Sequence, residues 1–212
     1  LDIRMTLEPF NDFRIDLEAT RRFTETHTEY FKDTLLDQFA EFTHNIPKDV
    51  GSLTVSYSAL NTLFNDSRSE IIDLFRTFEN NRVVISRRIG TGNHSDPVLS
   101  ELGYTSGYGR TQQDVLIPAF LSAYEGTDPQ MVGLNVFDIL PKVNWRLSYN
   151  GLSKLPFFRD IFQNFTIDHA YKSTLTVNSF GTGLDYLRTR NDGGINELNG
   201  NFYPRLEMPQ IG

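Results

Sequence analysis

The chain of 212 residues contains no cysteine. This absence excludes disulfide frameworks, thiolate metal sites and cysteine nucleophiles. Histidine is scarce as well, and the four histidines are scattered along the sequence without the close spacing of metal ligands. The sequence also lacks any apolar run near the ~20 residues that a membrane-spanning helix needs.

Positive charge is in short supply, because 20 lysines and arginines face 27 acidic residues and the net charge is -7. No basic stripe is present to neutralise phosphates, which argues against a general binder of nucleic acid. No nucleophile, base and orienting acid can be assembled from the motifs of the sequence. We therefore expect no enzyme, no cofactor and no metal site.

Alternation of apolar and polar residues is the strongest pattern that is present. It runs through residues 1–8, breaks at the short turn EPFND (8–12), and resumes over residues 13–22. Two alternating runs joined by a short turn predict an antiparallel hairpin. After Phe23 the alternation stops in TETHTEYFKD, a segment that is polar on both faces.

Three further alternating runs predict strands over residues 53–59, 143–151 and 165–180. Their apolar faces are rich in aromatic residues, and their polar faces carry charge. A sandwich core would accept this pattern, but a barrel wall explains both faces, with water on the polar side and lipid on the other.

This interpretation assigns residues to two faces. We expect these side chains to face a lumen: Arg14, Asp16, Glu18, Arg146, Asp168, Lys172, Thr174 and Asn178. We expect these to face lipid: Phe13, Ile15, Leu17, Trp145, Leu147, Tyr149, Tyr171, Leu175 and Val177. The two-residue period of a strand fixes the grouping within each run.

A long insertion separates the predicted strands, which divides the chain into barrel strands and a hairpin (1–60), a helical and loop insertion (61–142), and further barrel strands (143–212). Ser67 and Glu70 form a capping box that predicts a helix. Its apolar face comprises Ile71, Leu74, Phe75 and Phe78. A second helix is predicted for QDVLIPAFLSAYEG (113–126). The apolar face of the first helix needs a partner, so we expect the insertion to be an ordered gating or docking element.

The predicted strands suit a membrane span of roughly 9–11 residues. Five or six of them cannot close the smallest barrel, which has about eight. We therefore expect an all-β fold, in which antiparallel transmembrane strands form part of a very large barrel and carry a helical insertion. The segment PFFRDIF (156–162) is unusually aromatic for a turn, and we expect it to enter the membrane interface or to pack on a partner.

Five stretches carry a family resemblance in their order along the chain: EPFNDFRIDLEATR, NNRVVISRRIG, QDVLIPAFLSAYEG, VNWRLSYNGLSKLPFF and FTIDHAYKSTLTVNSF. They resemble the carboxyl-terminal part of the SprA/Sov family, the giant outer-membrane translocon of the type IX secretion system in Bacteroidota. Family members are many times longer than this chain. The chain opens and stops inside alternating runs, so we expect a piece of a larger wall.

The resemblance implies protein export through the outer membrane. The family forms a very wide barrel that is capped on the extracellular side and has a lateral opening. Folded cargo with a type IX carboxyl-terminal signal passes through it. The implied partners are the remainder of the same barrel polypeptide, the PorV shuttle barrel, a plug protein and the cargo.

Two other interpretations stay open. The first is another outer-membrane β-barrel, such as a receptor or a porin. The second is a soluble β-sandwich binding module, in which the apolar faces would form an ordinary core.

Overall fold

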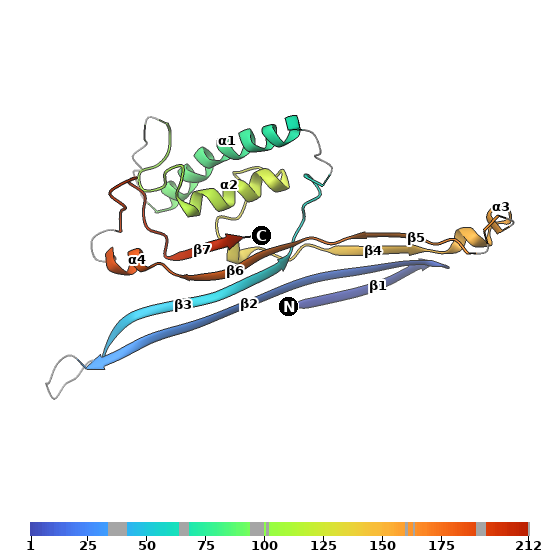
Figure 1. Cartoon of the computed structure of the whole chain (residues 1–212), viewed down its shortest axis with the longest axis horizontal. Coiled ribbons are helices and arrows are strands. Elements are labelled where there is room, and N and C mark those ends of the chain that lie inside the picture. Colours follow the sequence, from blue (N-terminus) through green and yellow to red (C-terminus); the bar gives the residue numbers. More distant parts are fainter. Residues whose placement is uncertain are drawn as a thin grey trace.

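The chain folds into a curled, mostly antiparallel sheet with helices packed on one face (Figure 1). The computed structural model describes residues 1–33, 42–63, 68–93, 100, 102–159, 161–162, 164–189 and 194–211. The strands are β1 (Asp2–Phe10), β2 (Phe13–Asp33), β3 (Phe42–Ser56), β4 (Asn144–Tyr149), β5 (Ile167–Tyr171), β6 (Thr174–Thr182) and β7 (Leu206–Ile211). The helices are α1 (Arg68–Asn93), α2 (Gln113–Glu125), α3 (Pro156–Arg159) and α4 (Leu184–Thr189), with 3-10 turns η1 (Val136–Asp138) and η2 (Gly151–Lys154).

The antiparallel sheet and the helical insertion of the predicted fold are confirmed, but the all-β class is wrong. Helices α3 and α4 lie outside the insertion, so the fold mixes helices with the sheet. Ser67 of the predicted capping box lies outside the described residues. Within the described part of the chain, no helix combines the length and the apolar character needed to cross a bilayer.

The predicted hairpin is confirmed, because β1 and β2 pair antiparallel across a tight turn. Asp12 closes this turn with a positive φ of 69°, a conformation that aspartate tolerates better than most residues. Strand β2 continues beyond Phe23, where the alternation stops, to Asp33, and it has 21 residues. Its second half pairs with β3 through the backbone, which does not require apolar side chains.

Strands β3 and β4 are two parts of one line along β2. β3 pairs with β2 as far as Arg21, and β4 takes over at Glu18 and continues in the same direction. Residues 57–143 are therefore inserted between two strands, β3 and β4, that lie end to end along β2. At the point of return the Lys142 backbone N–H donates to the Ser56 carbonyl at 2.8 Å, and Ser56 Oγ donates to the Lys142 carbonyl at 2.6 Å.

Strands β5 and β6 continue one another in the same way, with a break at residues 172–173, so the single strand predicted over 165–180 is wrong in this detail. Ser173 closes the break. Its backbone N–H donates to Asn144 Oδ1 at 3.0 Å, and its carbonyl accepts from the Tyr57 backbone N–H at 3.0 Å. The insertion therefore emerges from a hydrogen-bonded seam between two halves of the sheet.

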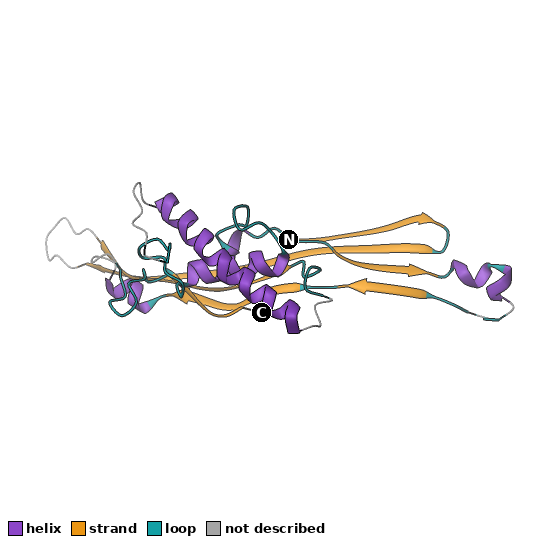
Figure 2. Cartoon of the chain, turned by 90° about the horizontal axis from the view of Figure 1, so that it is seen from above, coloured by secondary structure: helices purple, strands orange, loops and turns teal. Residues whose placement is uncertain are grey.

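The two long helices, α1 and α2, lie over only one of these halves. α1 and α2 cross above the half of the sheet that contains β3, β6 and β7, and β1, β4 and β5 extend away from them (Figures 1 and 2). α3 stands beyond the ends of β4 and β5 at the far end of the molecule. One side of the sheet is therefore covered by α1 and α2 over one half and left uncovered by them over the other half.

Candidate functional surfaces

In the half that α1 and α2 leave uncovered, apolar side chains line up in rows across four strands. The rows are Met5, Leu17, Trp145 and Tyr171; Leu7, Ile15, Leu147 and His169; and Phe10, Phe13, Tyr149 and Ile167. Directly paired residues share a face of the sheet, so these rows form one surface, which we call the bare apolar face. Large apolar side chains remain open on it, with Met5 49% and Phe10 57% exposed. Apolar surface of this extent marks a site of contact with a partner or a membrane.

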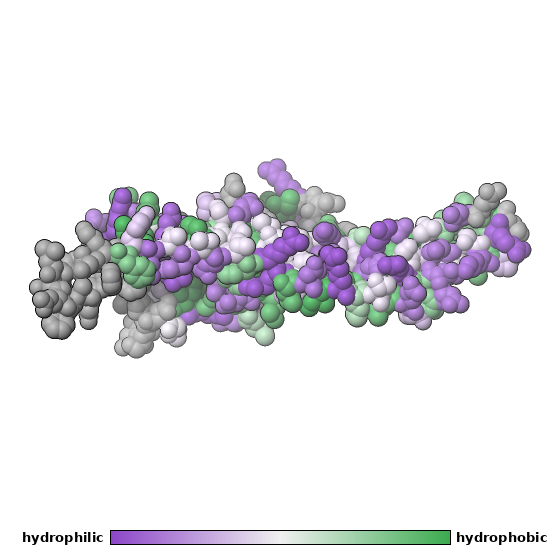
Figure 3. All heavy atoms as spheres, turned by 90° about the horizontal axis from the view of Figure 1, so that it is seen from below, coloured by the Kyte–Doolittle hydropathy of each residue, from purple (hydrophilic) through white to green (hydrophobic). Residues whose placement is uncertain are grey.

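The opposite side of the same four strands carries charge. Arg14 pairs with Asp16 at 2.9 Å, Arg4 pairs with Glu18 at 3.3 Å, and Arg146 pairs with Asp168 at 3.4 Å. The Thr6 hydroxyl also donates to Asp16 at 2.7 Å. Exposed ion pairs of this kind contribute little to stability. Hydrophilic residues run along much of this side in the view from below (Figure 3).

The register places the predicted residues into the two expected groups over the first half of the sheet. Phe13, Ile15, Leu17, Trp145, Leu147, Tyr149 and Tyr171 all belong to the bare apolar face. Arg14, Asp16, Glu18, Arg146 and Asp168 lie on the charged side. Lys172 lies in the break between β5 and β6, and Thr174 and Asn178 are exposed on β6. Which solvent each side meets stays a prediction.

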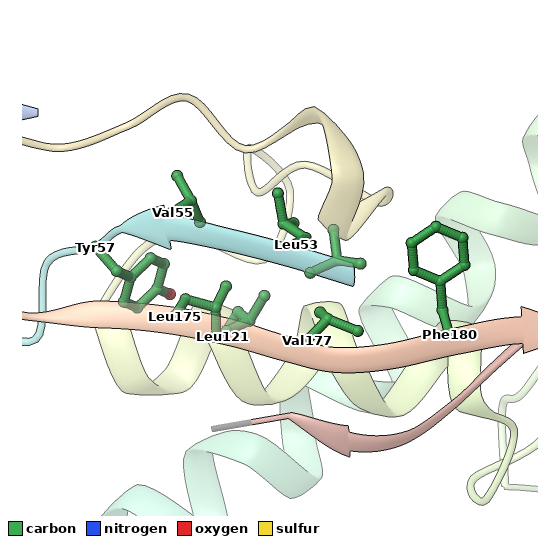
Figure 4. Close-up of a cluster of buried hydrophobic side chains, with 8 residues drawn as sticks. Leu53, Val55, Tyr57, Leu121, Leu175, Val177 and Phe180 are labelled. Atoms are coloured by element: carbon green, nitrogen blue, oxygen red, sulfur yellow. The ribbon is translucent and has the colours of Figure 1, made fainter. Parts of the chain in front are cut away.

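Leu175 and Val177 need a correction, because protein covers them. Val177 pairs with Leu53 and Leu175 pairs with Val55, and all four side chains are buried. They pack with Leu121 of α2 in one hydrophobic core (Figure 4). Tyr171 is buried too, and its hydroxyl accepts a hydrogen bond from the Ala59 backbone N–H at 2.6 Å. The alternating pattern found the correct face but not the helix that covers it.

The part of the insertion that packs on the sheet, which includes α2 and η1, is called the helical cover below. Arg21 lies where the bare apolar face meets this helical cover. It follows Leu17 and Ala19 on the same side of β2, where a charge is unexpected. The guanidinium donates to the Phe137 carbonyl at 2.7 Å and lies 5.6 Å from the centre of the Phe23 ring. These contacts provide the partners that a charge on an apolar face needs.

Aromatic rings gather at the other end of the bare apolar face. Phe10 stacks on Phe13 at 4.8 Å between ring centres, and the Tyr149 ring meets Phe13 edge-on at 6.1 Å. Beyond them the Lys154 ammonium contacts Asp12 of the hairpin turn at 2.7 Å. This contact ties the segment around α3 to the end of the hairpin.

A cavity of about 360 Å³ lies between α2 and the covered half of the sheet. Its apolar wall includes Phe23, Ile117 and Phe180, and Asp114 lies among the lining residues. Burial raises the pKa of Asp114, although a hydrogen bond from Gln112 opposes this effect. Among the residues that the structure describes, no three histidine or acidic side chains come together in a set that could hold a metal ion.

The predicted apolar face of α1 is only partly covered. Phe78 meets Phe120 of α2 edge-on at 6.1 Å, but Ile71 and Phe75 are 44% and 58% exposed. The buried part of the same stripe lies further along and includes Ile85. Sequence reasoning missed this part, although Val83, Val84 and Ile85 signal it in the run NNRVVISRRIG. A partner for the first half of α1 stays a prediction.

The comparisons with known proteins add no relative. No model of a protein family matches the chain, and the search of curated proteins gave no match.

Proposed function

We propose that this chain is a segment of the wall of a very large outer-membrane β-barrel, the translocon that exports folded cargo by type IX secretion. The observation that carries the proposal is the two-sided half of the sheet. An open apolar surface and a charged surface lie back to back across four strands. A barrel wall between lipid and a water-filled lumen requires this arrangement.

The length of β1 and the open edges of this half support the same proposal. β1 has nine residues, and it pairs with β2 from Phe13 to Thr20. Roughly 9–11 residues of a tilted strand cross a bilayer. Among the described residues, the outer edges of β1 and β5 pair with no further strand. Open edges of this kind fit neighbouring strands of a longer wall, which the rest of the barrel polypeptide would provide.

The export function rests on the resemblance to the SprA/Sov family. In this proposal the charged side lines the conduit for folded cargo with a type IX carboxyl-terminal signal. The PorV shuttle barrel and the plug protein are the proposed alternating partners. The proposed location is the outer membrane of a Gram-negative bacterium of the Bacteroidota.

Cysteine labelling tests the membrane wall directly, because the chain has no cysteine of its own. Neighbouring residues on opposite sides provide matched pairs: Leu7 with Thr6, and Leu147 with Arg146. In the full-length protein in its membrane, a water-soluble maleimide should label cysteines at Thr6 and Arg146 but not at Leu7 and Leu147. Labelling at all four positions, with recovery of the protein in buffer without detergent, would instead support a soluble binding module.

A photo-crosslinking amino acid tests the export function separately. Placed at Arg146, it should capture secreted cargo that carries the type IX signal, and placed at Leu147 it should not. Because the two residues are adjacent on β4 and point to opposite sides, the comparison controls for protein level and assembly. A wall that passes the labelling test but captures no such cargo would indicate a receptor or a porin.

A further inference from the structure

The segment from Leu155 to Phe162 exposes large apolar side chains at the end of the molecule. Phe157 is 72% exposed, Ile161 is 60% exposed and Leu155 is 47% exposed. A surface connection between two strands in water is normally built from polar and turn-forming residues. The exposed side chains therefore call for an apolar environment outside this chain.

The segment continues the bare apolar face. Phe158 and Phe162 contact the ring of Phe165 at 6.0 Å and 5.5 Å between ring centres. Phe165 precedes Ile167, which belongs to the last row of the bare apolar face together with Tyr149. The Asn150 backbone N–H donates to the Asp12 carbonyl at 3.0 Å, so the connection that carries the segment is fixed to the hairpin turn where it leaves β4.

The bare apolar face has a different marker at each end. At one end stand the aromatic rings of Phe10, Phe13 and Tyr149, next to the segment around α3. At the other end Arg21 bonds to the Phe137 carbonyl, where the helical cover begins. β1, with nine residues, pairs with the stretch of β2 between these markers. That length matches the apolar band of a membrane strand.

We propose that the described residues of this segment, 155–159 and 161–162, lie in the headgroup layer of a lipid bilayer and anchor one boundary of the bare apolar face there. This inference rests on the proposed membrane wall and adds a defined lipid contact to it. Aromatic and aliphatic side chains next to a basic one are typical of segments that lie in a membrane interface, and Arg159 is the basic residue within this segment. Continuity with the bare apolar face favours lipid over a protein partner, because the same apolar phase then covers both.

Spin labels at single cysteines can measure this depth in the full-length protein in lipid nanodiscs. The test positions are Phe157 and Ile161. Leu147 on the bare apolar face reports the hydrocarbon layer, and Arg14 on the charged side reports water at the level of the aromatic rings. Collision with oxygen, which enters lipid, is compared at each position with collision with a water-soluble nickel chelate.

We expect the oxygen-to-nickel collision ratio to be highest at Leu147 and lowest at Arg14. The ratios at Phe157 and Ile161 should lie between them, several-fold above that of Arg14. Ratios at Phe157 and Ile161 equal to that of Arg14, with Leu147 still deep in lipid, would overturn the inference and leave the membrane wall intact. Low collision with both reagents at Phe157 would indicate a protein partner and would also overturn it. If Leu147 itself behaved as in water, the proposed membrane wall would fail.

Discussion

The two halves of the sheet present the same face to different surroundings. From Phe13 to Phe23, alternate side chains of β2 point to one side, and the pairing of β2 with β4 and then β3 keeps its register over this stretch. Over β1, β4 and β5 this side is open, whereas over β3 and β6 a helical insertion covers it. The insertion leaves the sheet between the two halves, at Ser56, and folds back over only one of them.

This contrast separates two properties that an alternating sequence combines. Alternation determines which side chains share a face, because successive residues of a strand point to opposite sides. It does not determine what covers that face. Leu53 is fully buried in protein and Leu7 is 42% exposed, although both occupy apolar positions of alternating strands.

The largest expected effect concerns the covered half. Leu53→Ala removes a side chain with no exposed surface from the core of β3, β6 and α2, and should lower the free energy of local opening by about 2–5 kcal/mol. Hydrogen exchange of the β3 and β6 amides measures this quantity. Leu7→Ala on the bare apolar face is the matched control and should change the same amides little. Equal effects from both variants would remove the distinction between the halves.

A charge on the bare apolar face should have the next largest effect. Leu147→Arg places a guanidinium in the middle row of this face, which costs about 2–4 kcal/mol at a bilayer midplane. Urea titration of the full-length protein in lipid vesicles measures the loss. Ser148→Arg, one residue away on the charged side, should cost much less. Similar small effects from both variants would place water on both sides.

The sequence predicts well which side chains share a face of the sheet. It predicts poorly which distant segments pair with one another. The hairpin of β1 and β2 follows from local alternation and a short turn, and the structure confirms it. The second half of β2 carries polar side chains on both faces, so it has no period to detect. Its pairing with β3 depends on backbone hydrogen bonds and on cross-strand contacts such as Thr24 Oγ1 with Ser52 Oγ at 2.9 Å.

The candidate surfaces show the same limit. Most of the bare apolar face was predictable, since its rows need only alternation within each strand and a matching register. Phe10 was not, because it lies in the predicted turn and joins its row across a register shift in β1. The burial of Leu175 and Val177 was not, because it depends on α2, which is more than fifty residues away in the sequence. Likewise, no local pattern shows that β3 and β4 lie on one line.

A smaller effect is expected at the boundary between the halves. Arg21→Gln removes the cation near the Phe23 ring and the charged hydrogen bond to the Phe137 carbonyl. We expect a loss of about 1–2 kcal/mol, because the side chain is only partly buried. Protease cleavage near η1 should become faster as this contact is lost. Arg21→Lys keeps the positive charge and should restore part of the protection, and an unchanged cleavage rate in Arg21→Gln would show that the contact does not hold the cover.

The smallest effect concerns the far end of the covered half, where β2 and β3 extend beyond the helices. His27 Nδ1 lies 2.5 Å from Asp49 Oδ1, and His27 Nε2 lies 3.4 Å from Glu29 Oε1. The hydrogen bond with Asp49, followed by that with Glu29, raises the pKa of His27 above its ordinary value of 6.5. The Arg205 guanidinium, 3.8 Å from Asp49, also faces this cluster, and it competes for the same carboxylate.

A raised pKa in the folded state means that the fold favours the charged imidazole. The stabilisation is therefore fully present below the ordinary pKa and is lost as the pH rises through the raised value. NMR titration of His27 measures the pKa, and the free energy of unfolding measured across this range gives the linked change in stability. His27→Gln should remove that part of the pH dependence while leaving the helical cover intact. A His27 pKa at or below the ordinary value would show that the two carboxylates do not stabilise the charged ring. His27→Gln and the parent chain should then show the same pH dependence of the free energy of unfolding.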